Sequence, residues 1–229
     1  MRIDVWSDVV CPWCWLGKAR LEKALAAFPH GQHVEVVFRS FELDPGAPKE
    51  RDISTNEMLA KKYGLRPAQI AAMHERIRGM GLADGVEFRF DRTRTSNTFD
   101  AHQIIHLASA EGRQKMMLDR LFRAQFYEGV RIGDRGELVR LATESGLERA
   151  GVDAALDDQR FAPAVRDDEA QAHALGISGV PFYVVDGRFG VSGAQSVEVL
   201  RRVFDEAWAR RSITGGDPQA GACDDGCPV

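Results

Sequence analysis

The sequence has few cysteines, no excess of basic charge and no long apolar run. Among its 229 residues, 30 basic and 34 acidic side chains give a net charge of −4, which does not favour contact with the phosphate backbone of nucleic acid. No apolar run approaches the length that crosses a bilayer, and the first residues lack the apolar core of a signal peptide. We therefore expect no nucleic-acid partner, no membrane association and a cytoplasmic location.

The four cysteines lie at the two ends of the chain. Cys11 and Cys14 form one pair, Cys223 and Cys227 form the other, and no cysteine lies between the pairs. A disulfide framework would spread its cysteines through the sequence. In a reducing compartment, such pairs are more often catalytic or metal-binding than structural, so the cysteines are the first candidates for a function.

The beginning of the sequence has the pattern of a βαβ unit. Residues 2–6 read as a short strand, and residues 34–38 are rich in β-branched side chains, as in a buried strand. Between them, apolar residues from Leu16 to Phe28 recur at helical spacing. The Cys11 turn therefore falls between a strand and the helix that follows it.

Strand patterns return near the end of the sequence. Asp186-Gly187 predicts a two-residue hairpin between strands at 181–185 and 188–191. A helix over residues 195–211 follows, and its inward face is predicted to carry Val199, Val203, Phe204 and Ala207.

The middle of the sequence is helical in pattern. Ser54 and Glu57 fit a capping box that opens the first of its helices. Asn97 or Thr98 can cap a later one. The remaining apolar periodicities predict helices over 67–78, 98–110, 113–127, 135–144 and 162–175.

This order predicts an α/β protein, with a thioredoxin-like fold interrupted by an all-helical insertion domain. The thioredoxin-like domain comprises residues 1–53 and 176–213, the insertion comprises residues 54–175, and a C-terminal tail comprises residues 214–229. The tail is rich in Gly, Asp, Pro and Ala, so its composition predicts a flexible segment. Two independent domains are disfavoured because neither end has enough strands to form a sheet alone.

The Cys11-Pro12-Trp13-Cys14 turn predicts redox chemistry. At the start of a helix, unpaired N–H groups and the helix dipole favour an anion, so Cys11 is expected to ionise readily and attack disulfides. Cys14, one helical turn further, would resolve the mixed disulfide, and Pro12 suits the first turn. We expect partial exposure of Cys11. The alternatives are two small buried apolar residues or half of a zinc site.

Four motifs carry a resemblance to a known family: WSDVVCPWC at residues 6–14, SNTFDAH at 96–102, GVPF at 179–182 and GAQ at 193–195. With them the chain resembles the FrnE-like branch of the DsbA family of thiol:disulfide oxidoreductases. The resemblance implies that Cys11 is the nucleophile, that Cys14 resolves, and that a cis Val180–Pro181 bond lies beside them. The residues then assigned to substrate binding are Pro12, Trp13, Asn97, Phe99, His102, Val180 and Pro181.

Two features depart from the family pattern. Val5 stands where thioredoxin-type proteins usually carry a carboxylate that accepts a proton, so the proton acceptor for Cys14 is unassigned. The pair at Cys223 and Cys227 has three intervening residues where the family pattern has four. We interpret this pair as an accessory redox pair that shuttles electrons to, or regulates, the Cys11/Cys14 couple. The alternative is an inert tail.

These observations predict an enzyme that reduces or isomerises protein disulfides through mixed-disulfide exchange. Its partners would be protein disulfides and a cellular thiol reductant, either thioredoxin or a low-molecular-weight thiol, and no cofactor or metal is expected. One alternative is an enzyme of the kappa-class glutathione transferase or hydroxychromene carboxylate isomerase kind, although those relatives usually have serine at position 11. Another is a chaperone module, or a zinc module that binds through all four cysteines. His102 and His106 have a metal-ligand spacing, but a core or surface role is favoured.

Overall fold

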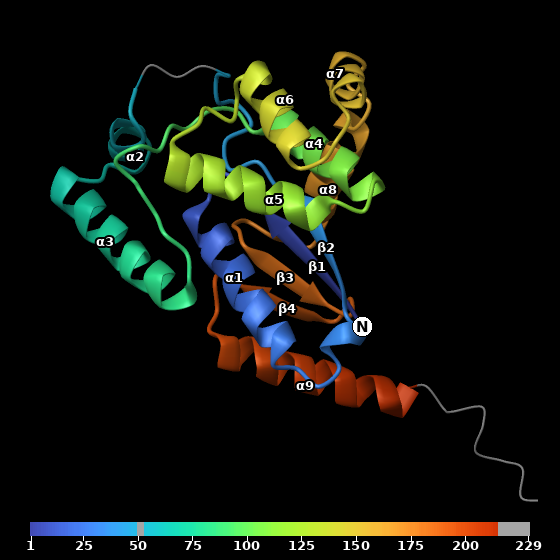
Figure 1. Ribbon diagram of the computed structural model, residues 1–229. Helices are drawn as coiled ribbons and strands as arrows, with labels where there is room; N and C mark the ends of the chain where they lie inside the picture. Colours follow the sequence, from blue (N-terminus) through green and yellow to red (C-terminus); the bar gives the residue numbers. More distant parts are fainter. Residues whose placement is uncertain (50–52, 215–229) are drawn as a thin grey trace, which may run out of the picture.

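The computed structural model describes residues 1–49 and 53–214 (Figure 1). One four-stranded sheet has the order β2-β1-β3-β4. Its strands are β1 (Arg2–Ser7), β2 (Glu35–Ser40), β3 (Phe182–Val185) and β4 (Phe189–Ser192). Strand β1 runs parallel to β2 and antiparallel to β3, and β3 runs antiparallel to β4. Two segments about 140 residues apart in the sequence therefore build one sheet, as the predicted thioredoxin-like fold requires.

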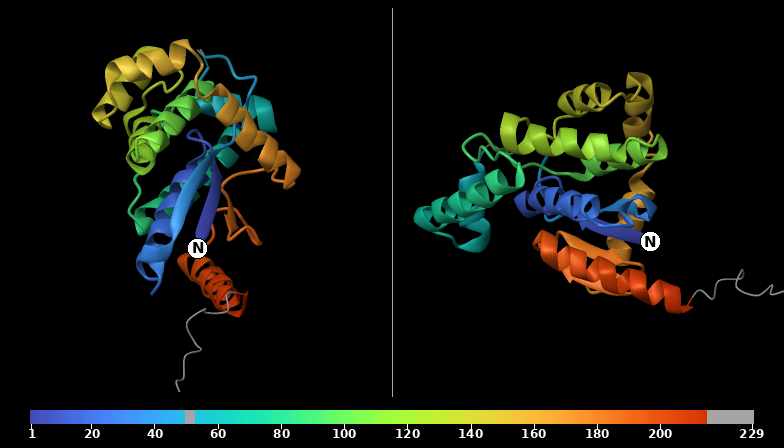
Figure 2. Two further views of the ribbon diagram at one scale, coloured as in Figure 1. Left: turned by 90° about the vertical axis from the view of Figure 1, so that its right-hand side faces the viewer. Right: turned by 60° about the horizontal axis from the view of Figure 1, so that its bottom comes forward.

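The two faces of the sheet are covered differently. Helices α1 (Pro12–Ala26) and α9 (Val197–Thr214) pack together, and α9 also contacts β3. Their apolar residues join one core with Ile3 and Val5, whereas Trp6 belongs to a second cluster with Ala172 and Ile177. Figure 2 shows α9 at one end of the molecule and most helices of the middle segment, coloured green to yellow, toward the other end.

The middle segment is helical, and its helices are α2 (Thr55–Tyr63), α3 (Pro67–Asp84), α4 (Phe99–Ala110), α5 (Gln114–Arg123), α6 (Arg135–Glu144), α7 (Arg149–Asp157) and α8 (Ala162–Ala174). A π-helical turn, η2 (Ala124–Glu128), extends α5, and a 3₁₀ turn, η1 (Gly31–His33), precedes β2. Helices α2 and α3 stand apart from the others, with α3 against α1 (Figure 1). This confirms the predicted fold class, and the residue boundaries of the insertion domain stay a prediction.

Several local signals act as the sequence predicts. Ser54 and Glu57 form a capping box, in which Ser54 Oγ accepts from Glu57 N at 3.2 Å and the Glu57 carboxylate accepts from Ser54 N at 2.7 Å. The β3–β4 hairpin has positive φ angles at Asp186 (53°) and Gly187 (68°), as a type I′ turn requires. The cap of α4 is provided by Asn97, whose Oδ1 accepts from the backbone N–H of Phe99 at 2.9 Å.

Three helix predictions differ from the structure. Helix α7 was not predicted, because Arg149–Asp157 carries a glycine and a short apolar face of Val152, Ala155 and Leu156. Helix α3 runs six residues beyond its predicted end, to Asp84. Helix α9 begins at Val197 and buries Leu200 with Phe204 and Ala207, while Val199 and Val203 are only half-buried.

A buried polar cluster fixes α8 against the sheet. The carboxylate of Asp168 accepts from the Arg39 guanidinium and from Ser40 N, both at 2.9 Å, and lies 3.1 Å from His106 Nε2. The backbone carbonyl of Asp168 also accepts from the indole N–H of Trp6 at 2.8 Å. These contacts join α8, α4, β2 and β1 at one point, which holds the middle segment at the edge of β2.

The predicted tail begins at Thr214, the last residue that the structure describes. Cys223 and Cys227 therefore lie outside the described residues. Within the described part of the chain, no helix combines the length and the hydropathy that a membrane span needs.

Candidate active site

Cys11 lies at the start of α1, where the loop after β1 turns into the helix. It is the N-cap residue, with Pro12 in the first turn, and its carbonyl accepts from Cys14 N at 3.0 Å and from Trp15 N at 3.4 Å. Its own N–H donates to the carbonyl of Asp8 at 3.1 Å. The Cys11 side chain therefore lies at the positive end of the helix dipole, the position that the strand–turn–helix pattern predicts.

The loop before β3 faces this turn. The Val180–Pro181 peptide bond is cis, as the family resemblance implies. The Cys11 thiol donates to the carbonyl oxygen of Val180, with a sulfur–oxygen distance of 3.5 Å. Residues about 170 positions apart in the sequence thus meet at the Cys11 sulfur.

Both cysteines of the turn are free thiols, and both are buried. The exposed fraction is 4% for Cys11 and 2% for Cys14. The expectation of partial exposure for Cys11 was wrong, because side chains of the middle segment and Val180 enclose a cavity over it. Cys11 is reached through this cavity rather than from an open surface.

Cys14 lies deeper than Cys11. Burial, and after it the hydrogen bond and charge of the Cys11 thiol, raise the pKa of Cys14 well above its usual value, while the backbone of Asp8 and the hydroxyl of Ser7 act in the opposite direction. Tyr183 of β3 lies nearby, and burial followed by the two thiols raises its pKa as well. The surroundings of Cys14 therefore favour the protonated thiol while Cys11 is reduced.

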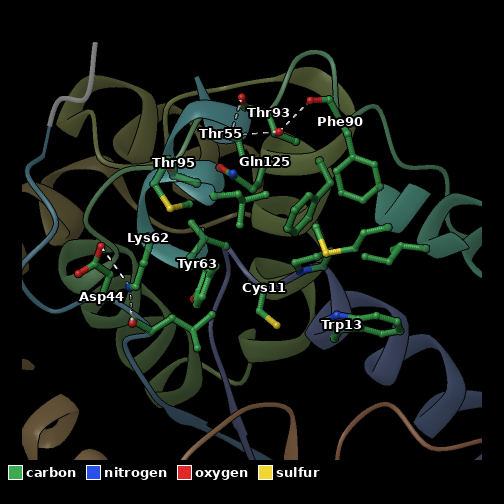
Figure 3. Close-up of a pocket in the computed structure, with 18 of the residues that line it drawn as sticks. Cys11, Trp13, Asp44, Thr55, Lys62, Tyr63, Phe90, Thr93, Thr95 and Gln125 are labelled. Atoms are coloured by element: carbon green, nitrogen blue, oxygen red, sulfur yellow. Dashed lines mark hydrogen bonds and ion pairs between the residues drawn. The ribbon is translucent and has the colours of Figure 1, made fainter. Parts of the chain in front are cut away.

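The cavity beside Cys11 has a volume of about 540 Å³. Its lining joins the cysteine turn (Cys11, Pro12 and Trp13) and Val180 to α2, α3 and the loop between α3 and α4 (Figure 3). Most of the wall is apolar and includes Met58, Leu59, Met73, Ile77, Phe90 and Phe126. Volumes of 300–1,000 Å³ are typical of sites for small organic ligands.

A buried polar pair lies behind the turn. The Asp8 side chain has no exposed surface, and its Oδ2 accepts from Leu43 N at 2.8 Å. Its Oδ1 is 3.5 Å from Nε2 of His102, which is also buried. The contact ties the loop after β1 to helix α4. His106 turns instead toward Asp168, and no cluster of three or more metal-ligating side chains occurs within residues 1–49 and 53–214.

The other assigned residues of the middle segment also lie away from the cavity lining. The Asn97 amide donates to the carboxylate of Glu42 at 3.4 Å and to the Pro45 carbonyl at 3.2 Å. The Phe99 ring stacks under the Arg166 guanidinium, 4.3 Å from its centroid. Burial raises the pKa of Glu42, despite a 2.7 Å ion pair with Arg166. Asn97 therefore contacts the loop after β2, Phe99 contacts Arg166 of α8, and His102 contacts Asp8 in the loop after β1. Pro12, Trp13 and Val180 line the cavity.

Sequence reasoning missed the cavity. Much of its wall comes from α2, α3 and the loop after α3, and apart from Ser96 those residues carry no motif. It also missed Gln125 and Thr95, whose polar atoms are buried in the same lining. The only available signal was composition, since methionine and aromatic residues in this segment read equally well as core.

The fold and the cysteine turn define a class of protein: a thioredoxin fold with two free thiols at the start of its first helix and a cis-proline loop opposite. The sequence pattern of the DsbA-like thioredoxin domain family matches residues 2–205. The chain therefore belongs to the DsbA-like thioredoxin domain family.

Individual relatives agree with this assignment. The protein YwbO of Bacillus subtilis is 30% identical over 210 residues, which are 90% of this chain and 96% of YwbO. A solved structure of a probable DsbA oxidoreductase from Streptomyces coelicolor is 44% identical, with a TM-score of 0.90 over 100% of this chain and 99% of that one. A 2-hydroxychromene-2-carboxylate isomerase shares the fold, at 13% identity and a TM-score of 0.69 over 94% of this chain and 100% of its own. The FrnE-like branch stays a prediction.

Proposed function

We propose that this protein is a thiol:disulfide oxidoreductase that acts through mixed-disulfide exchange at Cys11 and Cys14. The observation that carries the proposal is the placement of the Cys11 thiol. Cys11 is the N-cap residue of α1, its sulfur lies 3.5 Å from the carbonyl oxygen of Val180 beside a cis proline, and Cys11 lines the cavity. Cys14 lies one turn behind it as a second free thiol.

The proposed reaction proceeds in two exchanges. The Cys11 thiolate attacks one sulfur of a substrate disulfide, forms a mixed disulfide and releases the other sulfur as a thiolate. The Cys14 thiolate then attacks the Cys11 sulfur, which releases the second substrate thiol and leaves a Cys11–Cys14 disulfide. Two electrons pass from the dithiol to the substrate, and the two thiol protons pass to the two released sulfurs.

The surroundings of Cys14 suit this order of events. Part of the rise in its pKa comes from the hydrogen bond and charge of Cys11. Once the Cys11 sulfur is in a mixed disulfide, that contribution disappears and the pKa of Cys14 falls. The resolving thiol therefore becomes easier to deprotonate when it is needed.

We also propose the substrates, the direction of the reaction, the reductant and the role of the second cysteine pair. The substrates would be protein disulfides, held in part by the backbone of Val180, and the enzyme would act as a reductase or isomerase in the cytoplasm. A cellular thiol reductant, thioredoxin or a low-molecular-weight thiol, would regenerate the dithiol. Cys223 and Cys227 would act as an accessory redox pair.

The test is insulin reduction by the full-length protein with dithiothreitol as reductant. Wild type is compared with Cys11→Ser, Cys14→Ser and the double variant Cys223→Ser/Cys227→Ser. We expect Cys11→Ser to lose essentially all catalysed reduction, and the tail variant to keep a working Cys11/Cys14 couple. Undiminished activity in Cys11→Ser would reject the proposal.

A further inference from the structure

We propose that the cavity beside Cys11 binds uncharged, largely aromatic or aliphatic small molecules that carry a hydrogen-bond donor. We further propose that the Cys11/Cys14 couple reduces disulfides of this chemical class. The inference rests on the proposed function, because it uses the same two thiols. Beyond the proposed function, the inference names a class of small-molecule disulfide substrates that the lining of the cavity selects.

The shape and lining of the cavity favour a small apolar body. At about 540 Å³ it accommodates an organic molecule beside the sulfur of Cys11. Trp13 and Phe90 offer aromatic faces, and Met58 and Met73 are flexible side chains that adapt to different shapes. Burial of an apolar ligand here would displace water from a predominantly apolar surface.

The cavity has a polar end that lacks partners. Thr95, Ser96 and Gln125 line the cavity, and their side-chain oxygens Oγ1, Oγ and Oε1 are buried and make no hydrogen bond within the described residues. The amide nitrogen of Gln125 donates to the carbonyl of Arg94 at 2.8 Å, which leaves Oε1 as an acceptor. Figure 3 shows Thr95 and Gln125 on the side of the cavity away from Cys11 and Trp13. Because buried polar atoms normally have partners, this end fits a ligand that donates hydrogen bonds.

The charges around the cavity disfavour acidic ligands. The Lys62 ammonium lies 3.5 Å from the Asp44 carboxylate and also donates to the Leu43 carbonyl at 3.3 Å. Burial, and after it the charge of Arg78, lower the pKa of His74, whose ring is stacked on Phe90. Both effects favour the uncharged ring. Among the described residues that line the cavity, there is no other lysine, arginine or histidine. A ligand carboxylate would therefore be buried without a free cation, which is costly.

The proposed reaction needs no further reductant for one turnover. Cys11 attacks one sulfur of the small disulfide R–S–S–R, and the first R–S⁻ leaves and takes up a proton. Cys14 then displaces the second R–S⁻ from the Cys11 sulfur. The reduced protein and one disulfide thus give the oxidised protein and two R–SH molecules.

The first experiment compares two matched disulfides, 4,4′-dithiobis(benzamide) and 4,4′-dithiobis(benzoate). The amide donates hydrogen bonds and is uncharged, whereas the benzoate is anionic and only accepts. Single-turnover rates with reduced full-length protein are divided by the rates of the same disulfides with dithiothreitol. We expect a preference for the amide of about tenfold to hundredfold. A normalised ratio near one would overturn the inference.

Variants assign the preference to the cavity. Thr95→Val removes one unpartnered hydroxyl and keeps the shape of the side chain, so the normalised amide rate should fall about threefold to tenfold, with the benzoate rate unchanged. Met73→Trp should fill the cavity and abolish the preference. Met116→Trp is the matched control, because Met116 lies on α5 with 52% exposure and is not part of the lining. Equal rates in all four proteins would contradict the inference.

Failure of the inference can be told apart from failure of the proposed function. If insulin reduction depends on Cys11 but the two disulfides react alike, the redox function stands and the ligand class is wrong. If insulin reduction does not depend on Cys11, the redox function itself fails. A direct readout, NMR binding of the non-exchanging 4-(methylthio)benzamide, should show shifts in wild type that Met73→Trp loses. Absence of binding to wild type would count against the cavity as a site.

Discussion

Gly17 lies inside α1, two turns beyond Cys11, at a point where the helix touches the cis-proline loop. A Cβ atom at this position would lie 2.4 Å from the hydroxyl oxygen of Tyr183 and 3.0 Å from Cγ of Pro181. The Tyr183 hydroxyl is buried and has no hydrogen-bond partner among the described residues. The absence of a side chain at Gly17 therefore lets α1 approach the loop that holds Val180 beside Cys11.

We predict that Gly17→Ala destabilises the protein. Alanine favours a helix over glycine by about 1 kcal/mol, but overpacking costs about 1–3 kcal/mol. A contact at 2.4 Å is about an ångström shorter than ordinary contact, so the upper end of that cost applies and the net loss is about 1–2 kcal/mol. Because α1 must shift, the activity of Cys11 should also fall.

Tyr183→Phe provides the rescue. It removes the closest atom, and alone it should be neutral or stabilising, because the hydroxyl is buried without a partner. In that background Gly17→Ala should cost less, with a coupling of at least about 1 kcal/mol in a double-mutant cycle. Urea unfolding gives the free energies, and insulin reduction reports the effect at Cys11.

The matched control is Gly79→Ala in α3, because a Cβ atom at Gly79 would meet nothing within 4 Å beyond its chain neighbours and the backbone of its own helix. It should stabilise the protein by about 0.5–1 kcal/mol. The reasoning is refuted if Gly17→Ala stabilises the protein as Gly79→Ala does, or if Tyr183→Phe gives no coupling.

Three further predictions concern stability. Burial alone would raise the pKa of Asp168, but hydrogen bonds from His106 and Ser40 N hold it below its usual value. Asp168→Asn should therefore lower the free energy of unfolding by about 2–4 kcal/mol in urea at pH 7, and this loss should shrink as the pH falls below about 4. The control Asp167→Asn, at an exposed neighbouring residue, should change the free energy of unfolding by less than about 0.5 kcal/mol. Because the pKa of Cys14 is raised, the reduced protein should lose stability as the pH rises above about 8.5, and Cys14→Ala should flatten that decline. Asn97→Ala removes the cap of α4 and should cost about 1 kcal/mol in thermal or urea unfolding.

Local signals explain how much of the fold could be predicted. The β-branched run before Ser40, the Asp186-Gly187 turn and the Ser54 capping box each act within a few residues, so their structures follow from sequence alone. Helix α7 was missed because its short apolar face and Gly151 give a weak period, and packing against α4 and α6 supplies its stability. The connection of both ends into one sheet followed from the number of strands, since neither end can form a sheet alone.

The candidate site was predicted only where it lies within one motif. The cysteine turn was found because strand, turn and helix are adjacent in sequence. The burial of Cys11 was not predicted, because the residues that cover Cys11 belong to α2 and α3 and include Val180, which lie between about 45 and 170 residues away in the sequence. No role was predicted for Asp8 from the sequence. Strand β1 ends at Ser7, and beyond it the Asp8 side chain turns inward to Leu43 N and His102.

The most direct measurement is to identify the cysteine that carries a trapped substrate. Full-length Cys14→Ala, incubated with a peptide disulfide and quenched with acid, should accumulate a mixed disulfide that peptide mass spectrometry places on Cys11. Cys11→Ala treated in the same way should accumulate none within the turn. If Cys14→Ala traps nothing, or if the adduct forms as readily on another cysteine, Cys11 is not the attacking thiol and the account of this site is wrong.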